Sequence, residues 1–201
     1  ENLSYYIDYL QDRKYFAESV YGSCPFEVQI DNNLPQLANQ PISIKFISPS
    51  QYQIKVEFES NTVNAYKYSD YSSSIVNVAE GVFSKKYKIG EYIKLPFLSW
   101  KLVLKKNSEN FVGQEYKVRF DDFNGVVQNY KNIKVDIDDK APSILKLSLE
   151  GTNKARIVDY LNETVRVLIK NQLDKKNLFA DNTINFIDTT LALMELKLRD
   201  A

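Results

Sequence analysis

Few residues of this chain could carry chemistry, and histidine is missing altogether. Histidine is the commonest general base and metal ligand, so its absence excludes Ser-His-Asp and Cys-His catalysis and an ordinary zinc site. The six glycines are scattered singly, so the chain has neither a phosphate-binding loop nor a dinucleotide-binding fingerprint. The sequence therefore disfavours an enzyme, and we expect no cofactor.

Two remaining candidates are a lone thiol and an acidic cluster. Cys24 is the single cysteine, so it forms no internal disulfide, and no base accompanies it; a buried or incidental thiol is the simpler interpretation. Asp136, Asp138 and Asp139 could offer carboxylate oxygens to a divalent cation. They lack the glycine and the ligand spacing of a calcium loop, so a solvated turn is favoured and no metal site is predicted.

A third candidate is the tyrosine cluster Tyr66, Tyr68 and Tyr71. Aromatic faces can stack on sugars or bases, which would make these residues a binding platform. Alternate exposed positions of an ordinary strand would look the same. We therefore do not assign them a binding role.

The overall composition describes a β-rich protein without a charge-driven partner. Lys plus Arg and Asp plus Glu both number 26, so no net charge attracts nucleic acid, and the 14 Tyr and 11 Phe favour packed strands. No apolar run is long enough to span a bilayer. Since the chain opens on Glu1 rather than Met, we expect it to be part of a longer protein.

Alternating apolar residues predict the strands that position any site. The pattern at 42–58 predicts an antiparallel hairpin, and Leu98, Trp100, Leu102 and Leu104 form the most regular apolar face. Residues 31–40 are polar and are predicted to be a loop. Apolar spacing over 123–130 predicts a short helix, with Asp121 and Asp122 as its N-terminal charge and cap. We predict an α+β fold in one domain spanning 1–201: a mostly antiparallel sheet packed by helices, with a β-rich insertion at about 41–110.

The last quarter of the chain predicts one very long helix over about 152–200. It contains no Pro or Gly after Gly151, and Thr152 or Asn153 can cap its start. Val158, Leu161, Val165 and Leu168 recur at helical spacing and are predicted to face a core. Such a helix would be roughly 70 Å long, about twice the width of a domain of this size. We therefore expect it to leave its own domain and find another partner.

The end of this helix carries a coiled-coil-like seam. Apolar residues recur at steps of four and three from Ala180 onward. The polar stretch 170–177 separates the seam from the first stripe. A second helix folding back on the first is the alternative, although 170–177 contains no Gly or Pro. The candidate interaction surface consists of Ile184, Ile187, Leu191, Met194 and Leu198.

In Ser143–Asn162 a strand of the type "ilxlsl" leads through a turn into a helix opening "kAxxixxxLN". In these residues the sequence resembles the periplasmic region of bacterial polysaccharide co-polymerases. Lys176–Ala180 and Thr183–Asp188 resemble the continuing helix of Bacteroides-type members. The family comprises the Wzz-type chain-length determinants and the Wzc-type tyrosine autokinases.

This resemblance implies a domain of an inner-membrane protein that projects into the periplasm and assembles into a homo-oligomeric ring through the long helix. Such proteins regulate the chain length or export of capsule, exopolysaccharide or O-antigen, without covalent chemistry in the periplasmic part. The implied partners are the polysaccharide polymerase or export machinery and the polysaccharide itself, with no nucleic acid. A cytoplasmic tyrosine kinase domain of the parent protein would lie outside this chain.

Two alternatives remain open at this point. A secreted carbohydrate-binding or adhesive β module would account for the strands and the tyrosines, and it predicts a terminal helix that folds back and measurable glycan affinity. A hydrolase with paired carboxylates would need two acids that converge in a cleft.

Overall fold

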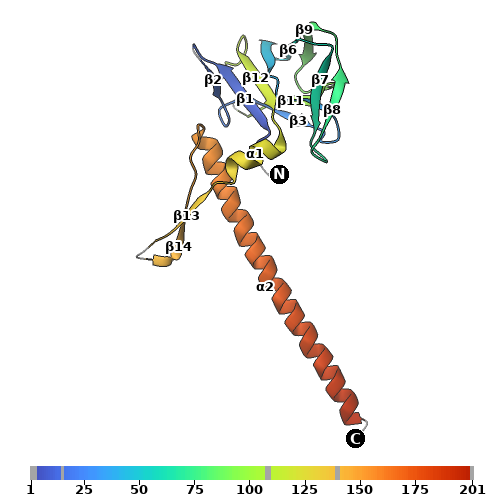
Figure 1. Ribbon diagram of the computed structural model, residues 1–201, viewed down its shortest axis with the longest axis vertical. Coiled ribbons are helices and arrows are strands. Elements are labelled where there is room, and N and C mark those ends of the chain that lie inside the picture. The colour runs from blue at the N-terminus through green and yellow to red at the C-terminus, as the bar shows by residue number, and fades with distance from the viewer. Residues whose placement is uncertain (1–3, 15, 107–109, 139–140, 200–201) are drawn as a thin grey trace. The chain divides into compact units, whose positions relative to one another are not determined.

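A computed structural model describes residues 4–14, 16–106, 110–138 and 141–199 of the chain (Figure 1). The fold is α+β, as predicted, with antiparallel sheets and two helices. The chain divides into two compact units, Glu1–Ile157 and Val158–Ala201. The first unit contains the strands, helix α1 and the first turn of helix α2. The second consists of the remainder of α2.

The largest sheet has six antiparallel strands in the order β2-β1-β12-β5-β6-β9. Strand β1, near the N-terminus, pairs with β12, so Ile7 lies opposite Phe120. The predicted hairpin at 42–58 is confirmed as β5 and β6. The strands are β1 (Ile7–Asp12), β2 (Ala17–Ser19), β5 (Ile42–Ser48), β6 (Gln51–Phe58), β9 (Gly81–Lys88) and β12 (Glu115–Phe120).

Two three-stranded sheets and one two-stranded ribbon complete the strands. Their orders are β10-β11-β3, β4-β7-β8 and β13-β14. Residues 41–110 therefore supply strands to the same sheets as residues 7–37 and 115–120. The bounds are β3 (Phe26–Ile30), β4 (Gln36–Leu37), β7 (Thr62–Lys67), β8 (Ser72–Asn77), β10 (Tyr92–Leu95), β11 (Leu98–Leu104), β13 (Lys134–Asp138) and β14 (Ala141–Ser148).

The core forms where the sheets face one another. The ring of Phe26 on β3 meets the ring of Phe46 on β5 edge to face, with centroids 5.4 Å apart. Trp100 on β11 is fully buried, and its Nε1 donates a hydrogen bond to the hydroxyl of Tyr52 on β6 at 3.2 Å. Its predicted companions Leu98 and Leu102 are also fully buried, and Leu104 is partly buried.

Helix α1 (Phe123–Tyr130) follows β12 where the sequence predicted a short helix. The Asp122 side chain caps it by accepting a hydrogen bond from the Gly125 amide at 2.6 Å. None of its residues is fully buried, although Phe123 and Val126 pack partly against the core. The sheets, rather than helices, therefore cover most of one another's apolar surface.

Helix α2 is one continuous helix of 46 residues from Lys154 to Arg199. The alternative of a second helix folding back after the polar stretch is therefore wrong. The predicted core-facing stripe is also wrong, because Val158, Val165 and Leu168 are 44%, 40% and 46% exposed and Leu161 is only partly buried. The residues of the hydrophobic core come from the segments before α2. The residue of α2 that is buried is Arg156, which is charged.

Candidate interaction surface and the anchor of the long helix

The five predicted seam residues all lie exposed on α2. The exposed fractions are 56% for Ile184, 49% for Ile187, 53% for Leu191, 58% for Met194 and 78% for Leu198. Because the helix is unbroken, their spacing of three and four residues places them along one side of it. An apolar stripe of this regularity left in contact with water is typical of an interaction surface.

A second apolar stripe lies on another side of the same helical segment, and the sequence analysis missed it. Phe179, Phe186 and Leu193 recur every seven residues, and Leu196 follows at the next three-residue step. They are 75%, 71%, 55% and 55% exposed, respectively. In a seven-residue repeat these positions lie nearly opposite the seam. The seven-residue spacing of the two phenylalanines was the signal that could have identified them.

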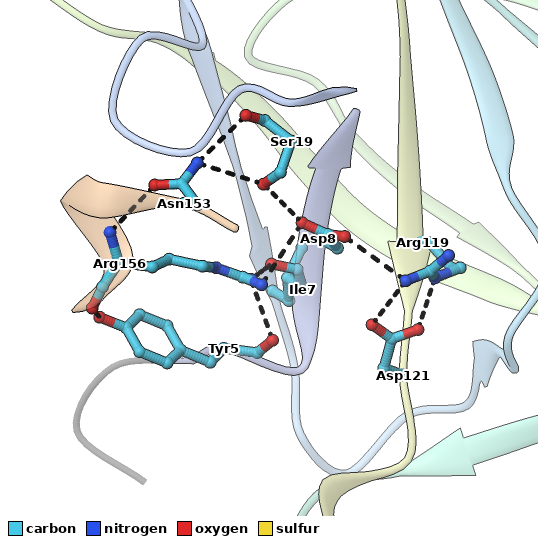
Figure 2. Close-up of polar contacts among 8 residues, drawn as sticks. All are labelled: Tyr5, Ile7, Asp8, Ser19, Arg119, Asp121, Asn153 and Arg156. Atoms are coloured by element: carbon cyan, nitrogen blue, oxygen red, sulfur yellow. Dashed lines mark hydrogen bonds and ion pairs between the residues drawn. The ribbon is translucent and has the colours of Figure 1, made fainter. Parts of the chain in front are cut away.

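The first turn of α2 is held to strand β1 by a buried arginine (Figure 2). One guanidinium nitrogen of Arg156, Nη2, donates to the backbone carbonyls of Tyr5 at 3.1 Å and Ile7 at 3.0 Å. The other, Nη1, lies 3.4 Å from the Asp8 carboxylate. A guanidinium presents several donors in a fixed plane, so one side chain can bind two carbonyls and a carboxylate together.

Asp8 connects this contact to the central strand β12. Its carboxylate accepts a hydrogen bond from the Ser19 hydroxyl at 3.1 Å and lies 3.4 Å from Arg119. Arg119 in turn donates to Asp121 at 2.6 Å, and this hydrogen bond raises the pKa of the arginine above its ordinary value. Figure 2 shows the resulting chain of alternating charges, Arg156–Asp8–Arg119–Asp121. Each buried charge therefore has an opposite charge beside it, which buried ions require.

Asn153 caps the helix, as the sequence predicted for Thr152 or Asn153. Its Oδ1 accepts from the Arg156 amide at 3.1 Å, while its Nδ2 donates to the Ser19 carbonyl at 3.1 Å. The Tyr5 hydroxyl donates to the Arg156 carbonyl at 2.7 Å, and the guanidinium lies over the Tyr5 ring at 5.0 Å. Both the amide and the carbonyl of Arg156 are thus bound to side chains.

The candidate chemical residues are dispersed. Cys24 is buried, and this burial raises the pKa of its thiol to about 11, so the thiol is not an activated nucleophile. Asp136 is exposed on β13, whereas Asp139 and the side chain of Asp138 lie outside the described residues. Among the described residues, no group of three or more Cys, Asp or Glu is arranged to hold a metal ion.

The three tyrosines do not form one exposed platform. Tyr68 is buried, and its hydroxyl donates to the Asp121 carbonyl at 2.8 Å. Tyr66 is partly buried, and its hydroxyl accepts from the Asn39 side chain at 2.7 Å. Tyr71 is 40% exposed but stacks on Phe123 with ring centroids 4.0 Å apart. Their aromatic faces are therefore largely engaged within the protein.

A pocket of about 250 Å³ lies beside the β13–β14 ribbon. Lys134 and Glu150 form an exposed ion pair of 3.1 Å at its wall, and amide side chains supply most of the remaining polar lining. The lining residues are Asn129, Asn132, Lys134, Ser148, Leu149 and Glu150.

Comparison with known proteins gives no family to which the chain can be assigned. Within the part of the chain that the structure describes, no helix is both long enough and apolar enough to cross a bilayer. The chain matches no protein-family model, and comparisons with curated proteins and with solved structures give no match either.

Proposed function

We propose that this chain is a non-catalytic oligomerising domain, and that the seam of α2 joins copies of it. One observation carries the proposal: Ile184, Ile187, Leu191, Met194 and Leu198 repeat as in a coiled coil and are all about half exposed or more. Fully burying an exposed side chain of this size contributes about 1.5–3 kcal/mol. Since most of these side chains are about half exposed, each would contribute about half of that range on association, and the five together favour it.

The buried anchor supports a scaffolding role. Arg156 and Asn153 connect the start of α2 to the backbone carbonyls of Tyr5, Ile7 and Ser19 through three hydrogen bonds. Through Asp8 the same network reaches β12. The first turn of α2 therefore belongs to the same compact unit as the sheets. No catalytic step belongs to the proposal, because the sequence has no histidine and its thiol is buried.

The biological setting follows from the resemblance of Ser143–Asn162 to polysaccharide co-polymerases. In the structure these residues include most of β14 and the beginning of α2, separated by the short segment 149–153. This order agrees with the strand, turn and helix that the resemblance implies. We propose that the domain lies in the periplasm, as part of an inner-membrane protein whose ring of copies regulates the chain length or export of a surface polysaccharide. Its partners there are the polymerase or export machinery and the polysaccharide.

The test of oligomerisation compares the wild type with a seam variant. Light scattering coupled to size-exclusion chromatography should give a mass of several chains for the wild type and of one chain for Ile187→Asp with Leu191→Asp. The matched control is Asn171→Asp with Asn185→Asp, which adds the same charge at exposed positions outside the seam. The fluorescence of Trp100, which is fully buried, checks that the sheets remain folded.

A monomeric wild type at tens of micromolar would contradict the proposal, and so would an oligomer that survives the seam variant. The polysaccharide setting has its own readout. In the source cells, the seam variant should alter the length distribution or surface amount of polysaccharide, and the control variant should not. An unchanged distribution, with the variant protein present at the wild-type level, would reject the setting while leaving oligomerisation intact.

A further inference from the structure

The residues of the seam and those beside it specify how the helices meet. In the repeat abcdefg of a coiled coil, a is followed by d after three residues and d by a after four. The spacing of the seam therefore fixes the assignment without ambiguity. Position a holds Asn177, Ile184, Leu191 and Leu198, and position d holds Ala180, Ile187 and Met194.

The two columns that flank the seam differ in charge. Position e holds Asp174, Asp181, Asp188 and Glu195, and position g holds Lys176, Thr183, Thr190 and Lys197. Within the described residues, none of the four acidic side chains takes part in an ion pair. The helix thus presents one wholly acidic edge and one edge of lysine and threonine.

This asymmetry distinguishes the two possible orientations of neighbouring copies. In an antiparallel pair, e faces e, so two acidic columns would lie against each other. In a parallel pair that is in register, g of one helix faces e of the next heptad on its neighbour, so Lys176 faces Asp181. One pair of opposite charges then meets, Asp188 and Glu195 face threonines, and like charges are kept apart. Charge complementarity favours the parallel orientation.

Asn177 gives a second argument that does not depend on charge. It is the polar residue at position a where the apolar seam begins. In a parallel, in-register assembly the a residues of all copies form one layer, so the Asn177 side chains can hydrogen-bond to one another. In other registers or orientations each would meet an apolar layer without a partner, which is costly for a buried amide.

The apolar residues themselves bear on the number of helices. Ile184 at a and Ile187 at d form one pair, and Leu191 at a follows Ile187 at d. Isoleucine at both positions, and leucine at a with isoleucine at d, shift coiled coils from two strands toward three or four. The combination that favours two strands, isoleucine or valine at a with leucine at d, does not occur in this seam.

We infer that α2 packs along Asn177–Leu198 against α2 of at least two further copies, parallel and in register. The inference rests on the proposed oligomerisation and adds the orientation, the register and the lower limit on the number of copies. The lysine and threonine edge of each helix then lies against the acidic edge of its neighbour.

Disulfide trapping on the full chain tests the orientation. Leu198→Cys should give chains cross-linked to each other through position 198, because in-register parallel helices bring these positions together. A mixture of Leu198→Cys with mass-tagged Ala180→Cys should give no link between 180 and 198. Asn185→Cys, exposed outside the seam, is the matched control and should stay uncrosslinked. Cys24 is 2% exposed with a thiol pKa of about 11, so it does not compete.

Light scattering on the wild type supplies the number of copies. A mass of three or more chains together with the 198–198 link supports the inference. An oligomer linked between 180 and 198 overturns the orientation, and a mass of two chains overturns the lower limit, while both leave the proposed oligomerisation standing. A wild type that is monomeric at every concentration overturns both.

Discussion

Replacement of Arg156 by alanine is the most direct test of the anchor. The side chain of Arg156 is 10% exposed and that of Asp8 is 9% exposed, so water screens their interaction little. Arg156→Ala removes the donors that bind the carbonyls of Tyr5 and Ile7 at 3.1 and 3.0 Å. It also leaves the Asp8 carboxylate with Ser19 and Arg119 as its remaining partners.

The expected loss of unfolding free energy is about 3–5 kcal/mol, the usual cost of removing one partner of a buried ion pair. Two hydrogen bonds from a charged donor, at about 1.5–3 kcal/mol each, give the same magnitude independently. A domain of ordinary stability has about 5–15 kcal/mol in total. The variant should therefore be markedly destabilised, with a clear shift of its urea midpoint.

The assay is urea unfolding followed by the fluorescence of Trp100, the single tryptophan, which is fully buried among the sheets. Arg166→Ala is the matched control, because Arg166 lies on the same helix but is 68% exposed in its ion pair with Glu163. An exposed pair of this kind contributes about 0–1 kcal/mol. A double-mutant cycle of Arg156→Ala with Asp8→Ala then isolates their coupling.

A loss of stability for Arg156→Ala no larger than that for Arg166→Ala would contradict the role of the anchor. A coupling between Arg156 and Asp8 below about 0.5 kcal/mol would contradict it as well, since contacting charges in one network normally couple by more than this. Hydrogen exchange of the amides at 154–157 provides a second readout, because loss of the anchor should increase their exchange before the sheets unfold.

Three further predictions concern the core, the thiol and the seam. Trp100→Ala should cost about 3–5 kcal/mol in urea unfolding, and an unchanged melting temperature would contradict the burial. Burial raises the pKa of the Cys24 thiol from 9.0 to about 11. The contribution of the neutral buried thiol to the free energy of unfolding is therefore fully present below pH 9 and is lost as the pH rises toward 11, by about 2–3 kcal/mol. Unfolding measured at pH 8 and at pH 11 should show that Cys24→Ala loses less stability between these two pH values than the wild type does. Asn177→Leu should raise the thermal stability of the assembly but broaden its mass distribution in light scattering, and an unchanged distribution would show that Asn177 does not set the register.

The strands and helices were largely predictable because their causes are local. Alternation placed β5, β6 and β11, and the same logic identified Trp100 as a core residue. The segment 31–40 shows where this logic fails. It was predicted to be a loop, yet it contains β4, in which Gln36 is fully buried. The side-chain amide of Gln36 donates to the backbone carbonyl of Ser99 at 2.7 Å and accepts from the backbone amide of Ser99 at 3.2 Å. This side chain therefore makes the pair of hydrogen bonds that a strand backbone would make.

The anchor could not be predicted for a related reason. From sequence alone, an arginine in the first turn of a helix is normally expected to be exposed to solvent. The burial of Arg156 depends on contacts with residues 149 and 151 positions away in sequence. Only the cap at Asn153 has a local signature, and it was predicted. The seam, by contrast, is a periodic feature, so its residues could be identified from the sequence, whereas a proposed partner for them could not.

The composition of α2 connects helix formation with assembly. Isolated helices are marginal in water, and most helical stability in proteins comes from packing of an apolar face. The segment 158–199 is rich in Asn, Asp and Thr, which favour helices less than Ala, Leu or Lys do. All four of its threonines return a hydrogen bond from their hydroxyl to a carbonyl four residues earlier, a contact that slightly destabilises a helix. Under the proposed oligomerisation, the free energy that orders this segment comes largely from covering the seam, so folding of the distal helix and association of the copies would form one linked equilibrium.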